Sequence, residues 1–237
     1  QRFAGAMQLV KIVRENFPQL RILIGNTTGC SELIAEMLRR KFPENYADHI
    51  GVEVVGRTAQ PEKICLCGFQ NAWLLRETAR KYGYQWGVSC CPESNYRLDR
   101  LLGQQRQAEW YVRDMLLAHA YRCPDISLSQ VWDNGNVYGN SFWGGTGLCQ
   151  RYPLIYPKKA YVAVATLTRI LDRVELVREM PTPSNSIYAL EFKRRDGKLV
   201  YAVWTGRGTA ELQFDFAKQP SKLEIVDMYG RPQAPSL

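Results

Sequence analysis

The sequence predicts an α/β protein in which a parallel sheet covered by helices precedes a small antiparallel β unit. Three observations lead to this prediction. Apolar strand-like segments alternate with amphipathic helix-like segments over residues 1–180, which is typical of parallel sheets. Over residues 181–237, short segments instead alternate apolar and polar residues, as antiparallel strands do. The Pro181-Thr182-Pro183 stretch separates the two patterns, and we place a domain boundary there.

Five segments carry apolar residues at the three- and four-residue spacing of an amphipathic helix. Local signals support their ends: Pro18 stops the first helix, Ser31 can cap the second, and Gly83 ends the third. The five predicted helices cover residues 3–16, 31–40, 71–82, 104–121 and 158–173.

Short apolar runs between these helices predict four buried strands. Turn-forming residues follow them, among them Asn26-Thr27-Thr28-Gly29 after the first strand and a Gly/Asn-rich loop, 133–147, after the fourth. Pro92 and Glu93 stand at the C-terminal end of the third strand. The four predicted strands cover residues 21–25, 49–56, 86–91 and 125–132.

Four further strands are predicted beyond the boundary, as one antiparallel unit. Asp196-Gly197 is a strong hairpin signal, because glycine allows the positive φ that tight hairpin turns need. The four segments cover residues 188–192, 199–205, 210–216 and 223–228.

The strand order along the sequence does not separate a barrel from an open doubly wound sheet. No GxGxxG or GxxxxGK[ST] motif follows any strand, which disfavours nucleotide binding. A full (β/α)8 barrel takes about 250 residues, whereas residues 1–173 supply about half of its units. Because half a barrel leaves open sheet edges, we expect the other strands to come from an upstream segment or a separate chain.

Composition excludes several classes of protein. The chain is 46% hydrophobic and 23% charged, which is ordinary for a globular protein, and no apolar run approaches the roughly 18 residues that span a membrane. The net charge is +8, but the basic residues are scattered, so we interpret them as solvated surface and expect no nucleic-acid partner. Attraction to an acidic polysaccharide stays open.

The seven cysteines do not indicate a metal site, since no pair of CxxC motifs is present. We expect neither a metal nor another cofactor. The cysteines do not identify the redox compartment, and secreted, lysosomal and periplasmic locations all stay open.

Candidate site residues cluster at the predicted strand ends, where α/β barrels carry their active sites. Glu93 directly follows an apolar strand and is the candidate catalytic carboxylate; the alternative is a solvated Glu paired with Arg97 or Arg100. Aromatic faces and polar groups together are what binds sugars. The candidate substrate-binding residues are Asn26, Arg57, Tyr96, Trp132, Asp133 and Trp143. Three of these have alternatives as well: a core or lid residue for Trp132, a loop cap for Asp133, and a surface arginine for Arg57.

In these features the chain resembles the retaining glycoside hydrolases built on (β/α)8 barrels, and among them the xylosidase/iduronidase-like families. Residues 87–96 are similar to the context of that family's catalytic Glu, at the end of the seventh strand, with Pro92 where Thr or Ser is usual. Weaker likenesses occur in order along the chain, at residues 10–25, at Gly147-Leu148, at 156–161, at 201–205 and at 226–230.

The resemblance implies the C-terminal half of a (β/α)8 barrel over residues 1–180, followed by a small antiparallel β-sandwich domain over residues 181–237. It also implies a carbohydrate substrate and a two-carboxylate retaining mechanism with Glu93 as nucleophile. The family places its acid/base in an Asn-Glu pair after the fourth strand, and this sequence contains no such pair. We therefore expect the N-terminal half of the barrel to supply it, and this chain alone to be inactive.

Two other functions stay open at this point. One is a carbohydrate-binding pseudo-enzyme, motivated by the absent Asn-Glu pair and by Pro92. The other is an assembly subunit that pairs with another chain through the open edges of a half barrel.

Overall fold

The structure is a computed structural model, and the chain divides into two compact units. Unit 1 comprises Gln1–Asn95 and Leu117–Gln130, and unit 2 comprises Tyr96–Leu116 and Val131–Leu237. The structure describes residues 2–25, 36–37, 39–41, 43–55, 61–63, 76–85, 87–93, 103–123, 125–126, 128, 131–133, 145–151, 153–216 and 219–234.

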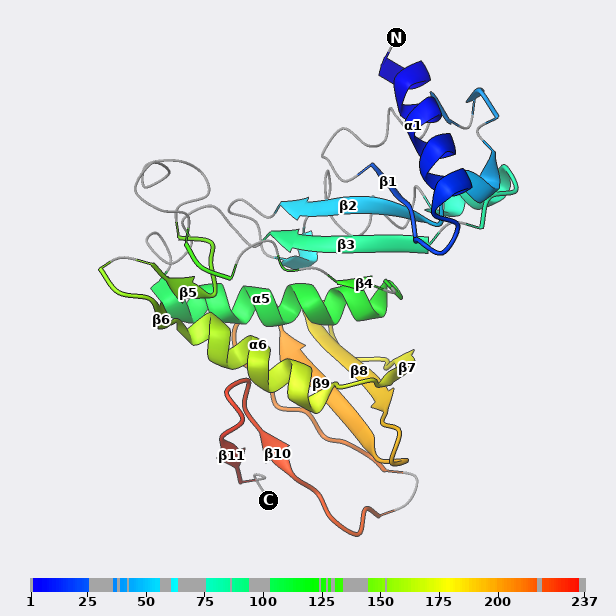
Figure 1. Cartoon of the computed structure of the whole chain (residues 1–237). Coiled ribbons are helices and arrows are strands. Elements are labelled where there is room, and N and C mark those ends of the chain that lie inside the picture. The colour runs from blue at the N-terminus through cyan, green and yellow to red at the C-terminus, as the bar shows by residue number, and fades with distance from the viewer. Residues whose placement is uncertain are drawn as a thin grey trace. The chain divides into compact units, whose positions relative to one another are not determined.

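Unit 1 is built on a four-stranded parallel sheet, which confirms the predicted strand direction. Each strand pairs with the next along the chain, and β2 and β3 lie side by side in Figure 1. A doubly wound sheet reverses its strand order at a switch point, and the described strands show no reversal. The strands are β1 (Leu23–Gly25), β2 (His49–Val55), β3 (Gly87–Glu93) and β4 (Asp125–Ile126).

Asp48 ties the first helix, α1 (Arg2–Asn16), to this sheet. Its Oδ2 lies 2.6 Å from Arg14 Nη2 on the helix and accepts the Ile22 backbone N–H at 2.7 Å. Burial raises the pKa of Asp48, but the hydrogen bonds from Ile22 and Arg14 outweigh this effect and leave the pKa below its ordinary value. Because Asp48 directly precedes β2, the contact joins the starts of β1 and β2.

The other predicted helices are confirmed where the structure describes them. The helix over residues 76–81 ends before Gly83, whose φ of +91° is readily adopted by glycine. The helix α5 (Gly103–Ala120) matches the expected segment, whereas Ser31 lies outside the described residues. In the part of the chain that is described, no helix is both long and apolar enough to cross a bilayer.

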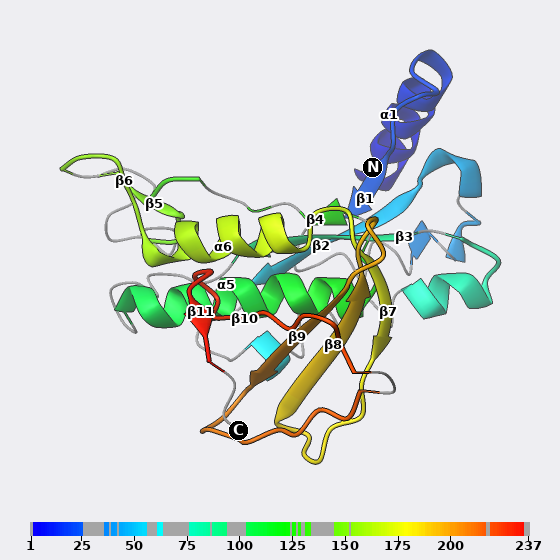
Figure 2. The same cartoon turned by 90° about the horizontal axis from the view of Figure 1, so that it is seen from below.

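Unit 2 combines the first part of α5, the helix α6 (Lys159–Ile170) and a three-stranded antiparallel sheet. The two helices lie side by side in Figures 1 and 2. The sheet contains β7 (Glu175–Glu179), β8 (Ile187–Lys193) and β9 (Leu199–Thr205), with β8 in the middle. The hairpin expected at Asp196-Gly197 joins β8 to β9, and Gly197 has a φ of +81°.

The strand β8 forms the core of this sheet, because both of its faces are covered. Leu190 and Phe192 are buried on one face, and Ala189 and Glu191 on the other. The Glu191 carboxylate meets the Arg178 guanidinium at 2.6 Å, so this buried charge is paired.

The prediction of a strand over residues 210–216 is wrong. This segment has no regular secondary structure, yet its side chains alternate between exposed and half-buried positions. Phe214 and Phe216 pack against the Tyr201 ring of β9, with ring centroids 6.0 and 5.9 Å from it. The apolar/polar alternation therefore reflects one-sided packing of side chains, without the backbone pairing that defines a strand.

The antiparallel sheet also begins earlier than expected, because β7 precedes Pro181 and pairs with β8 beyond Pro183. The domain boundary at residue 181 itself stays a prediction. The last predicted strand, 223–228, is only the two-residue β10 (Ile225–Val226), which pairs with the unexpected β11 (Pro232–Gln233).

The turn between β10 and β11 packs against both helices of unit 2. Tyr229 Oη donates to Gln105 Oε1 of α5 at 2.8 Å. Gly230 has a φ of +78°, and a Cβ there would lie 3.3 Å from Thr166 of α6. The turn is closed by Asp227, which accepts the backbone N–H groups of Tyr229 and Arg231.

The fourth predicted strand, 125–132, is shorter than expected. The strand β4 ends at Ile126, and Trp132 forms an isolated parallel bridge with Cys149 instead of closing that strand. Residue 149 opens β5 (Cys149–Gln150), which pairs with β6 (Tyr156–Pro157) in a small hairpin that the sequence pattern did not indicate.

Replacing Asp48 tests the anchor between α1 and the sheet. We expect Asp48→Asn to lower the free energy of unfolding by about 1–2 kcal/mol at pH 7, because two charge-assisted contacts weaken at a part-exposed site. A carboxyl whose folded pKa is lowered stabilises the fold above its unfolded pKa, and this contribution is lost as the pH falls.

The difference between wild type and Asp48→Asn in urea unfolding should therefore shrink below about pH 4. Asp172→Asn is the matched control, since its side chain is 70% exposed. A difference that stays constant from pH 7 to pH 3 would contradict this account.

Candidate functional site

Glu93 is the last residue of β3, at the carboxyl edge of the parallel sheet. Its backbone lies in register with Val55, the last residue of β2, so the carboxyl ends of these two strands coincide. Sequence reasoning placed Glu93 at a strand end, and the structure agrees. Of the other candidates, Asn26, Arg57, Tyr96 and Trp143 lie outside the described residues.

Trp132 and Asp133 belong to unit 2, where backbone hydrogen bonds hold them against Cys149. Asp133 N–H donates to Cys149 O at 2.9 Å, and Cys149 N–H donates to Val131 O at 2.7 Å. Trp132 is nevertheless 52% exposed. The backbone on either side of Trp132 is thus held by Cys149, while the indole stays accessible to a ligand.

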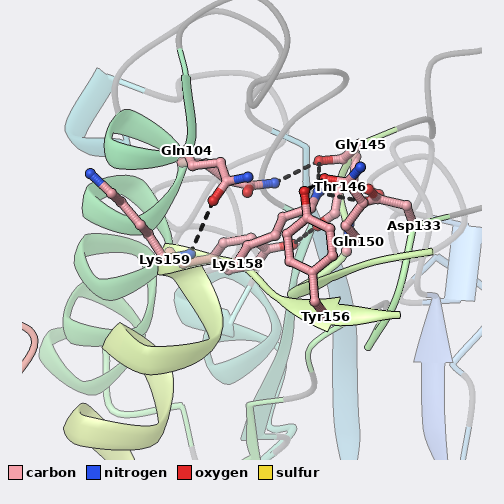
Figure 3. Close-up of polar contacts among 11 residues, drawn as sticks. Gln104, Asp133, Gly145, Thr146, Gln150, Tyr156, Lys158 and Lys159 are labelled. Carbon is pink, nitrogen blue, oxygen red and sulfur yellow. Dashed lines mark hydrogen bonds and ion pairs between the residues drawn. The ribbon is translucent and has the colours of Figure 1, made fainter. Parts of the chain in front are cut away.

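The Asp133 carboxylate forms an ion pair with Lys158, which directly precedes α6 (Figure 3). Lys158 Nζ lies 2.6 Å from Asp133 Oδ1 and 3.0 Å from Gly145 O. The Lys158 side chain has no exposed surface, and that of Asp133 is only 14% exposed. A buried ammonium must be paired, and here the carboxylate and the carbonyl supply its acceptors.

Two side chains of α5 also bind the backbone of Gly145 and Thr146, at the end of the Gly/Asn-rich loop. Gln107 Nε2 donates to Gly145 O at 2.6 Å, and Tyr111 Oη donates to Thr146 O at 2.5 Å. Both side chains are fully buried. The Gly145 carbonyl oxygen therefore accepts hydrogen bonds from both Gln107 and Lys158. A buried carbonyl without a donor would cost free energy, and these two bonds avoid that cost.

Gly147 allows the two ends of the loop to meet. Its N–H donates to Asp133 Oδ1 at 2.9 Å, the same oxygen that Lys158 contacts. A Cβ on Gly147 would lie 2.7 Å from Trp132 Cα and closer still to the backbone of Trp132 and Asp133. Only glycine permits this approach, since the clash is with backbone atoms that cannot rotate away.

The start of α6 depends on the same cluster. Lys158 occupies the position before the helix but makes no side-chain cap, and its backbone N–H donates to Leu148 O at 2.9 Å. The first helical N–H, from Lys159, is accepted by Gln104 Oε1 of α5 at 3.3 Å. A lysine is unfavourable beside the positive end of a helix, and the Asp133 carboxylate offsets that cost.

This polar cluster, made of Gln107, Tyr111, Asp133 and Lys158, was not predicted from the sequence. Only Asp133 was named, as a sugar ligand, and that role stays a prediction; its Oδ1 already accepts from Lys158 and Gly147. The described contacts of the cluster join α5, the residue before α6 and both ends of the loop, so it serves as a structural support. Among the described residues, no three His, Cys, Asp or Glu side chains gather as a metal site would need.

Replacing Gly147 tests the close approach of the loop ends. We expect Gly147→Ala to lower the free energy of unfolding by about 3 kcal/mol, at the upper end of overpacking costs, because the methyl group meets backbone. Gly5→Ala is the control: the site lies in α1 with open space around it, and alanine should stabilise the helix by roughly 0.5–1 kcal/mol. Equal effects of the two substitutions in thermal unfolding would contradict the prediction.

Comparison with solved structures relates this fold to a glycoside hydrolase. The chain is similar to a family 39 glycoside hydrolase from the gut symbiont Bacteroides cellulosilyticus WH2, with a TM-score of 0.77 and 15% sequence identity. The match covers 98% of this chain and 50% of the hydrolase chain. No protein-family model matches the sequence, and no curated protein matches it. At this identity the likeness shows a shared fold: nearly all of this chain has the fold of half of that glycoside hydrolase.

Proposed function

We propose that the chain is the C-terminal half of the (β/α)8 barrel of a retaining glycoside hydrolase, followed by a β-sandwich domain, with Glu93 as the nucleophile. The observation that carries the proposal is the position of Glu93 at the carboxyl edge of a parallel sheet whose strands follow one another in chain order. Barrels of this kind carry their catalytic residues at that edge. The fold shared with half of a family 39 glycoside hydrolase supports the same proposal.

In this mechanism the Glu93 carboxylate attacks the anomeric carbon and displaces the leaving group, forming a covalent glycosyl-enzyme. A second carboxylic acid protonates the leaving oxygen and then, as its conjugate base, takes a proton from the water that releases the sugar. The two carboxyl groups of a retaining enzyme lie about 5–5.5 Å apart. We assign the second one to the N-terminal half of the barrel, in an upstream segment or a separate chain.

Trp132 is the best supported substrate contact in this proposal. Trp132 is 52% exposed and its backbone is held by hydrogen bonds, so its indole offers a flat apolar surface to a sugar ring. Asn26, Arg57, Tyr96, Asp133 and Trp143 complete the proposed substrate-binding set on sequence grounds alone.

A mechanism-based label tests the nucleophile without the second carboxyl group. A 2,4-dinitrophenyl 2-deoxy-2-fluoro-β-glycoside has a leaving group that needs no protonation, and the fluorine slows release of the adduct. We expect the xyloside or the glucoside to add one fluoroglycosyl group per chain, and peptide mass spectrometry to place it on Glu93. Glu93→Gln should abolish the label, because an amide cannot attack.

Glu179→Gln is the matched control, since Glu179 also closes a strand but is exposed on the antiparallel sheet. Its labelling should equal that of the wild type. A label on another residue would contradict the assignment of Glu93. Binding of an oligosaccharide without any label would favour the non-catalytic carbohydrate-binding alternative, which the absence of an Asn-Glu pair motivates.

A further inference from the structure

We propose that Lys158 is a positioning residue for Trp132: its buried ammonium, acting through Asp133, fixes the backbone that presents the exposed indole. The inference rests on the proposed function for the identity of the ligand, a sugar ring. The fixing of the indole by Lys158 is a separate physical claim.

The Lys158–Asp133 ion pair has a desolvation cost. Lys158 is fully buried, and its ammonium had to leave water to reach Asp133. Replacing a buried ion pair by apolar groups of similar size is often neutral or stabilising, so the pair is weak evidence for a role in stability. Lys158 also stands where the dipole of α6 disfavours a cation. The geometry that the lysine enforces explains its presence better than the energy that it contributes.

A short series of contacts connects the Lys158 ammonium to the backbone of Trp132. Lys158 Nζ holds Asp133 Oδ1 at 2.6 Å, and Asp133 is the direct chain neighbour of Trp132. The same oxygen accepts Gly147 N–H, and Gly147 lies against the Trp132 backbone. Asp133 Oδ1 thus accepts two hydrogen bonds, one from Lys158 before α6 and one from Gly147 at the end of the loop. An apolar side chain at position 158 could not make the first of these bonds.

The supported residue, Trp132, is exposed. Burying a tryptophan is strongly favourable, yet Trp132 is 52% exposed while Cys149, Gly147 and Lys158 beneath it are buried. An exposed ring on a rigid backbone loses little conformational entropy when a ligand stacks on it. Without the ammonium, Asp133 loses its charged partner and the backbone at Trp132 and Asp133 gains freedom, so part of this preorganisation is lost.

The test observes the indole directly. The chain contains six tryptophans, and labelling with 5-fluorotryptophan gives each its own ¹⁹F NMR signal; Trp132→Phe identifies the one from Trp132. We expect Lys158→Met, which keeps the length of the side chain but removes its charge and donors, to shift or split the Trp132 signal. The Trp204 signal, from β9, should stay in place and show that the fold is retained.

Lys159→Met is the matched control, because Lys159 is the adjacent lysine and its Nζ donates to Gln105 Oε1 at the surface, at 3.2 Å. It should leave the Trp132 signal unchanged. If Lys158→Met does not fold, Asp133→Asn serves instead: it keeps the shape of the side chain but removes its charge, and the same signal should move. An unchanged Trp132 signal in a folded Lys158→Met or, failing that, a folded Asp133→Asn overturns the inference.

Calorimetric titration with xylohexaose and cellohexaose separates this inference from the proposed function. We expect Trp132→Phe and Lys158→Met each to raise the Kd of the bound oligosaccharide by about tenfold, and Lys159→Met to leave it unchanged. Weakened binding in Trp132→Phe with wild-type binding in Lys158→Met overturns the positioning role alone. Equal binding by wild type and Trp132→Phe overturns the proposed sugar contact, while the NMR signal still decides whether Lys158 holds the indole.

Discussion

Seven consecutive residue pairs hold β2 and β3 in parallel register, and the position of Glu93 depends on them. Both strands start level, at His49 and Gly87, and both end level, at Val55 and Glu93. A slip of one residue would move every side chain of a strand to the opposite face of the sheet. The anchor at Asp48, directly before β2, therefore matters for an edge of the sheet that lies a full strand length away.

Much of the fold could be predicted because local signals agreed with the tertiary structure. The helix α5 needed only its apolar spacing, and the β8–β9 hairpin needed only Asp196-Gly197. The strand prediction failed where the same apolar/polar alternation arises from side-chain packing and not from pairing with a neighbouring strand. Residues 210–216 alternate as a strand does, but they meet the ring of Tyr201 and not a free backbone edge, and no sequence pattern distinguishes these two environments.

The candidate site could be predicted only in part, for a related reason. The position of Glu93 at a strand end could be predicted, because a carboxylate after an apolar strand is a local signal. Lys158 could not, since a lysine beside a helix is ordinarily solvated, and its partner Asp133 lies 25 residues away in the sequence. Gly147 was one of several glycines in a glycine-rich loop, and only the approach of the Trp132 backbone distinguishes it.

The helix α6 takes the acceptor for its first N–H group from another helix. Gln104 lies 55 residues before Lys159, so the helix that follows residue 158 is started by a side chain from α5. Nucleating a helix is unfavourable, and an external acceptor lowers that barrier only when the two segments are already together. The two helices should therefore form as one cooperative event. For anyone dissecting the protein, a fragment that keeps α6 and the sheet β7–β9 but omits α5 removes the start of α6 as well as a packing partner.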